Sequence, residues 1–183
     1  IVKYPYPSIL AGKKSKFGYF VSEMDDYLKI AEELGIKRLS TEGEVPLYAR
    51  HPLVFLVEAA DDICYQMMDI EDAYKLKLLT PRETKELYQL FLSEKQKARV
   101  DEVFRLVSDE NEQIAYLRAT VIGILVKECT KVFMENENSI LKGTFEGALI
   151  KHINAPLNEA YKRCTQVAVE KIYRSRDVLD IEL

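Results

Sequence analysis

An unbroken helical pattern from Leu53 to about Leu79 restricts the fold of this chain more than any other feature. Apolar residues recur through it at helical spacing, no glycine or proline interrupts it, and Pro52 suits the first turn of a helix. Further segments carry the same period, and Thr80-Pro81-Arg82-Glu83 is a capping box with proline at the first helical position. The predicted helices are 22–34, 53–79, 80–92, 94–107, 110–135 and from 157 to 174 or beyond. No alternating strand pattern and no internal repeat is found, so we predict an all-α fold.

The composition is that of a folded chain. Its 183 residues suit one helical domain over residues 1–183, and only 7 glycines and 6 prolines among them exclude collagen-like and disordered classes. The longest uncharged apolar run, Ala119 to Val126, is far shorter than the about 20 residues that a membrane-spanning helix needs. Three cysteines, one necessarily unpaired, suit a reducing compartment. We therefore expect a soluble, cytoplasmic protein without a membrane partner.

The long helical segment has an acidic face. Between His51 and Tyr74 there are six carboxylates and no Lys or Arg. At about 100° per residue, one narrow arc of the helix collects Glu58, Asp61, Asp62, Tyr65, Asp69 and Asp72. The opposite stripe is apolar and consists of Leu56, Ala60, Ile63, Met67 and Ile70. The sequence thus predicts an amphipathic helix whose acidic face has no partner of its own.

Two interpretations of this face are open. Most charged helix faces are simply solvated, but they usually alternate in sign, because like charges one turn apart destabilise a helix by about 0.2–0.5 kcal/mol. Apolar flanks also suggest that the acids are partly enclosed, and an enclosed carboxylate must raise its pKa or meet a cation. A divalent metal would satisfy it, but one helix cannot complete such a site, and the chain has only 2 histidines.

The amino-terminal segment is basic and aromatic. It carries Lys3, Tyr4, Tyr6, Lys13, Lys14, Lys16, Tyr19 and Phe20. It can be a solvated loop, or its lysines can bind phosphates while its phenols contact a sugar ring. No phosphate-binding glycine loop or dinucleotide fingerprint accompanies it. The two histidines, His51 and His152, are isolated, and we interpret them as structural.

These segments resemble a known family. The matching residues are Lys3-Tyr4-Pro5, Lys16-Phe17-Gly18-Tyr19-Phe20-Val21-Ser22-Glu23, Arg50-His51-Pro52-Leu53, Glu58-Ala59-Ala60-Asp61-Asp62-Ile63-Cys64-Tyr65 and Asp69-Ile70-Glu71-Asp72-Ala73. In order and spacing they are similar to the bacterial deoxyguanosine triphosphate triphosphohydrolases of the HD-domain superfamily. The resemblance implies the helical portion of an HD-domain-type phosphohydrolase. It also implies metal-dependent hydrolysis of a dNTP, dGTP first, to the deoxynucleoside and tripolyphosphate.

The resemblance also implies roles for individual residues. Asp61 is the expected metal ligand, with Asp62 as second choice, and the metal is Mg²⁺ or Mn²⁺. Tyr65 and Asp69, one and two turns further along, face the sugar and phosphates. The other substrate-binding residues implied are Lys3, Tyr4, Lys16 and Arg176. A homo-oligomer is expected as well.

The chain departs from the family pattern at its ends. It begins at Ile1 and lacks the family's earlier His and His-Asp metal ligands, so we expect a carboxyl-terminal fragment that is inactive while the parent protein is an enzyme. The alternative is a non-catalytic helical module for protein interaction or nucleotide sensing. A net charge of −4 does not indicate a nucleic-acid partner, although one remains possible.

Overall fold

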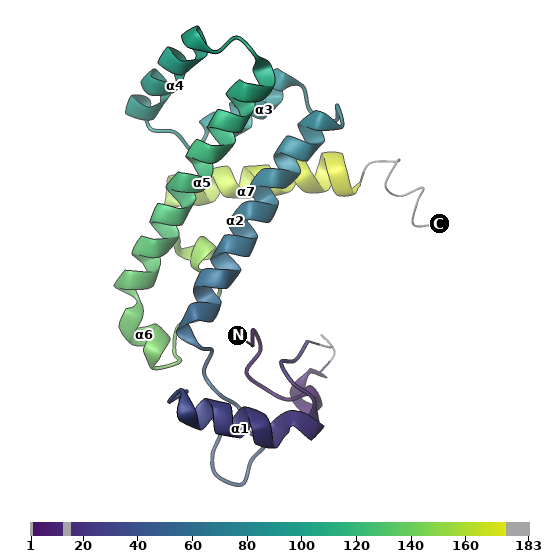
Figure 1. Cartoon of the computed structure of the whole chain (residues 1–183), viewed down its shortest axis with the longest axis vertical. Helices are drawn as coiled ribbons and strands as arrows, with labels where there is room; N and C mark the ends of the chain where they lie inside the picture. The colour runs from purple at the N-terminus through teal and green to yellow at the C-terminus, as the bar shows by residue number, and fades with distance from the viewer. Residues whose placement is uncertain (1, 13–15, 175–183) are drawn as a thin grey trace. The chain divides into compact units, whose positions relative to one another are not determined.

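The computed structural model describes residues 2–12 and 16–174 of the chain. In these residues the regular structure is helical, with two isolated β-bridges, Pro7 to Tyr19 and Arg38 to Tyr48, and no strand (Figure 1). The all-α prediction is confirmed. The chain divides into two compact units, residues 1–58 with 131–149 and residues 59–130 with 150–183. The prediction of one domain over residues 1–183 stays a prediction.

The first unit is built around an aromatic cluster. Its elements are α1 (Met24–Glu33), α6 (Glu137–Leu141), the 3-10 turns η1 (Ser8–Leu10) and η3 (Val21–Glu23), and the ends of two longer helices. Tyr19 stacks on Tyr27 with ring centroids 4.1 Å apart, and Ala31 is buried beside them. The amino-terminal segment lies so close to itself that a Cβ at Gly18 would overlap the carbonyl oxygen of Tyr4. In the part of this segment that the structure describes, Gly18 therefore packs directly against Tyr4, and Tyr19 belongs to the aromatic cluster.

The second unit contains most of α2 (Pro52–Lys75) and α5 (Glu110–Glu135), together with shorter helices. These are α3 (Pro81–Gln89), α4 (Glu94–Leu106), the 3-10 turn η4 (Leu149–His152) and α7 (Ala155–Ala168), which continues into the π-helical turn η5 (Val169–Tyr173). In Figure 1, α7 lies across α2 and α5. The core joins Ile63, Met67 and Ile70 of α2 to an apolar stripe of α5 that contains Ile114, Leu117 and Val121. Tyr88 of α3 donates a buried hydrogen bond of 2.8 Å to the carbonyl of Met67.

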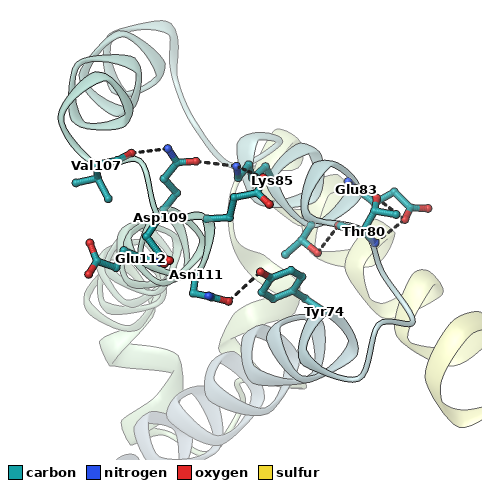
Figure 2. A network of polar contacts seen from close by, with 11 residues as sticks. Tyr74, Thr80, Glu83, Lys85, Val107, Asp109, Asn111 and Glu112 are labelled. Carbon is teal, nitrogen blue, oxygen red and sulfur yellow. Dashed lines mark hydrogen bonds and ion pairs between the residues drawn. The ribbon is translucent and has the colours of Figure 1, made fainter.

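Polar contacts hold the helix ends of this unit (Figure 2). The capping box predicted at Thr80 is present: its hydroxyl accepts from the amide of Glu83, whose carboxylate accepts from the amide of Thr80 at 2.8 Å. Lys85 of α3 donates to the side-chain oxygen of Gln113 of α5 at 2.7 Å. The capping box fixes the start of α3, and the contact of Lys85 with Gln113 joins α3 to α5.

Candidate functional site in the second unit

The predicted metal ligands Asp61 and Asp62 lie on α2 together with Tyr65 and Asp69, in the part of the helix that belongs to the second unit. The core face of α2 holds Ile63, Met67 and Ile70, as the apolar stripe predicts. Leu56 and Ala60, which were expected on the same stripe, are exposed. The buried positions nearest to them are Phe55 and Ala59, because the core face is rotated by one position at this end of the helix.

The acidic face is graded in exposure. Asp61 is exposed and Tyr65 is 67% exposed, whereas Asp62 and Asp69 are half-buried. The difference comes from α7, which covers one edge of the face: Tyr161 donates to the backbone carbonyl of Asp62 at 2.9 Å. Asp61 and Tyr65 thus present their side chains to solvent, and Asp62 and Asp69 border α7.

Asp69 has a specific partner. The hydroxyl of Tyr173, in the π turn η5, donates to Oδ2 of Asp69 at 2.7 Å. This hydrogen bond to a carboxylate, together with burial, raises the pKa of the Tyr173 phenol above its usual value. No sequence pattern pointed to Tyr173. It lies three residues before Arg176, which the family resemblance implies as a substrate-binding residue.

Contrary to the expectation that the acids lack cationic partners, Glu58, Glu71 and Asp72 each lie next to a Lys or Arg of this chain. Glu58 is held by Arg50 at 2.6 Å and by Lys3 at 3.1 Å, and these hydrogen bonds lower its pKa although burial opposes the shift. Glu71 is buried and pairs with Arg118 of α5, and Lys75 lies 3.4 Å from Glu71 and 3.8 Å from Asp72. The enclosed carboxylates Glu58 and Glu71 thus meet protein cations, which is one of the two outcomes that physical chemistry allows.

The amino-terminal candidates belong to the first unit. Lys3 is in the ion pair with Glu58, and its Nζ also lies 6.0 Å from the ring centroid of Tyr4. Tyr4 is half-buried and Lys16 is exposed. Asp61, Tyr65 and Asp69 belong to the second unit, and Arg176 lies outside the described residues. The structure therefore connects Lys3 with Glu58, a residue that the site prediction did not include.

A metal site can be tested on the side chains present. The described part of the chain contains no group of three or more His, Cys, Asp or Glu side chains that could hold a metal ion. Nδ1 of His51 accepts from the backbone amide of Leu53 at 3.2 Å, which fits the structural role expected of this residue. The described residues thus do not fit a complete metal site, and an exposed Asp61 can supply one carboxylate.

A cavity of about 770 Å³ opens beside α7 in the second unit. Asp62 and Tyr161 line it together with three basic residues, Lys151, Lys162 and Arg174. Its volume lies in the range of small-molecule sites, which is roughly 300–1,000 Å³. No sequence pattern predicted this cavity, which is formed by Asp62 of α2 and by residues between 150 and 174, the acidic Glu170 included.

Comparison with known proteins identifies relatives of this chain. No protein-family model matches it. It is 31% identical over 182 residues to a deoxyguanosinetriphosphate triphosphohydrolase-like protein of Pseudomonas aeruginosa (strain LESB58), which covers 96% of this chain and 39% of that protein. It is 33% identical over 158 residues to a protein of the same name from Synechocystis sp., covering 81% of this chain and 34% of that protein. The chain thus spans less than two fifths of the length of these curated relatives.

Within the described residues, no helix combines the length and the apolar character needed to cross a membrane. The motifs on α2, the all-helical fold and these matches agree with one another. Over nearly its whole length, this chain is related to one part of the deoxyguanosinetriphosphate triphosphohydrolase-like proteins.

Proposed function

We propose that the protein to which this chain belongs hydrolyses a deoxynucleoside triphosphate, with dGTP as the first candidate, to the deoxynucleoside and tripolyphosphate. The observation that carries the proposal is the match of nearly the whole chain to proteins named for this activity. The exposed Asp61 and Tyr65 on α2, followed by Asp69, support it, because they leave one face of the helix open to a ligand.

Each candidate residue has a role in this proposal. Asp61 supplies one ligand to a divalent cation, Mg²⁺ or Mn²⁺, with Asp62 as second choice, and the other ligands come from outside the described residues. Such a cation would polarise a phosphoryl oxygen. Tyr65 and Asp69 contact the sugar, and Arg176 contacts the nucleotide. Lys3, Tyr4 and Lys16 bind the triphosphate or sugar, which requires Lys3 to share its charge between Glu58 and the substrate.

A second part of the proposal concerns the activity of residues 1–183 by themselves. We propose that residues 1–183 alone are inactive, because the described residues lack a complete set of metal ligands. A homo-oligomeric, cytoplasmic parent protein is part of the same proposal.

The test uses the protein at the length of its relatives, with Mn²⁺ or Mg²⁺ and each dNTP, and measures tripolyphosphate. We expect hydrolysis of dGTP, and a loss of at least about 100-fold in Asp61→Ala, because one carboxylate ligand is removed. Asp101→Ala is the matched control, since Asp101 is an exposed acid on α4, and its activity should be unchanged. Absence of tripolyphosphate with every dNTP, or full activity of Asp61→Ala, contradicts the proposal.

The second candidate is a non-catalytic module that senses a nucleotide or binds a protein. The observation in its favour is that two acids of α2, Glu58 on the acidic face and the buried Glu71 beside it, already have cationic partners within the chain. Equilibrium binding of dGTP without turnover would support this candidate over the enzyme.

A further inference from the structure

Three hydroxyl groups of α7 and η5 donate to α2. Tyr161 donates to the backbone carbonyl of Asp62 at 2.9 Å, and Thr165 donates to the side-chain oxygen of Gln66 at 2.6 Å. Tyr173 donates to the carboxylate of Asp69 at 2.7 Å. The first two acceptors are uncharged, so only the third contact fixes a charged side chain of the acidic face.

The π turn brings Tyr173 into register with the other two donors. In an uninterrupted α-helix, at about 100° per residue, Tyr173 would be rotated by about 120° from Tyr161 and by about 80° from Thr165. The extra residue of the π turn takes back about 100°. Its presence is shown by the amide of Arg174, which donates to the carbonyl of Val169, five residues earlier, at 3.1 Å. Tyr173 then lies within about 20° of both donors, on the edge of α7 that borders α2.

Core packing does not explain this placement. The Tyr173 residue is 53% exposed, and no residue of η5 is buried. A π turn is rare and occurs frequently at functional sites. What the turn achieves is the contact between a phenol and one oxygen of a half-buried carboxylate, next to the exposed Tyr65 one turn earlier on α2.

We infer that Tyr173 is a positioning residue: it holds Oδ2 of Asp69, so that Oδ1 is left to accept a hydrogen bond from a hydroxyl of the substrate. This inference rests on the proposed function, in which Asp69 contacts the sugar. In a deoxynucleoside triphosphate the 5′ oxygen is esterified and the 2′ oxygen is absent, so the sugar has one free hydroxyl, the 3′ one. Tyr173 thus determines how well Asp69 recognises the 3′-hydroxyl.

The experiment compares dGTP with its 2′,3′-dideoxy analogue as substrates of the protein at the length of its relatives. Tyr173→Phe keeps the ring and removes only the hydroxyl. We expect kcat/KM for dGTP to fall about tenfold, mainly through KM, because a charge-assisted hydrogen bond that orients a binding group is lost. For the dideoxy analogue the change should stay within about twofold, since that substrate has no hydroxyl for Asp69.

Two further variants make the result specific. Tyr74→Phe is the matched control: Tyr74 also donates one phenolic hydrogen bond, at 2.8 Å to Asn111 (Figure 2), and its removal should affect neither substrate. Asp69→Asn should lower kcat/KM for dGTP, and adding Tyr173→Phe to it should cause no further loss, because the two residues act through one contact.

The role of Tyr173 and the triphosphohydrolase activity can fail separately in this experiment. An equal loss on both substrates in Tyr173→Phe, no loss on either, or an additive loss in the double variant overturns the role of Tyr173 while leaving the triphosphohydrolase intact. Absence of dNTP hydrolysis in the wild-type protein overturns the proposed function, and the role of Tyr173 with it.

Discussion

Replacing Arg118 with methionine should destabilise the second unit, because it removes the charge next to the buried carboxylate of Glu71. Glu71 is 8% exposed, and its carboxylate pairs with Arg118 of α5 and with Lys75, one turn further along α2. Methionine keeps most of the apolar stem of the arginine and removes its charge. Glu71 then retains only Lys75, whose side chain is 59% exposed and 3.4 Å away.

The magnitude follows from these two environments. Removing one partner of a fully buried ion pair costs about 3–5 kcal/mol, because the remaining charge stays desolvated. The Arg118 side chain is 31% exposed, and Lys75 offers a helical pair of about 0.3–0.5 kcal/mol. We therefore expect a loss of about 2–3 kcal/mol in Arg118→Met. Glu71→Gln should cost only about 1 kcal/mol, because the remaining arginine can be hydrated.

Equilibrium urea unfolding of the chain, followed by far-ultraviolet circular dichroism, measures these values, since the sequence contains no tryptophan. The double variant Glu71→Leu with Arg118→Met should regain most of the loss, because an apolar pair replaces the charges. Equal losses below about 0.5 kcal/mol in both single variants would refute the reasoning, since the pair would then behave as a solvated one.

Two other predictions concern titration and reactivity. Lys171 and Thr80 lower the pKa of Glu83 from 4.5 to about 2, so the stability that the ionised carboxylate contributes is present above about pH 4.5 and is lost as the pH falls through about 2. In urea unfolding, the free energy of unfolding of Glu83→Gln should decline less between these pH values than that of the wild type. An identical decline contradicts the assignment. Cys64 is exposed, whereas burial raises the pKa of Cys129 to about 11 and that of Cys164 to about 12. A thiol reagent should therefore modify one cysteine in the folded chain and all three only after unfolding, and rapid modification of a second thiol would show that the core is open.

Local signals were sufficient for most helices. The capping box at Thr80 and the apolar stripe of Ile114, Leu117 and Val121 depend on residues within a few turns of each other, so they can be recognised before folding. The end of α2 could not be recognised in this way. The helix stops at Lys75 instead of Leu79, because Lys77 adopts a left-handed conformation with φ of 61°, and a lysine carries no signal for that conformation.

The candidate site likewise has features that local sequence predicts and features that depend on tertiary packing. The gathering of Asp61, Tyr65 and Asp69 on one helix face follows from the helical period alone, and the family resemblance follows from linear motifs. The partners of the acids of α2 could not be foreseen: Arg118 reaches Glu71 from α5, and Tyr173 reaches Asp69 only because a π turn rotates it toward α2. Helical geometry is a property of neighbouring residues. Which acid forms an ion pair and which accepts a hydrogen bond from a tyrosine depends on packing between segments that are far apart in the chain.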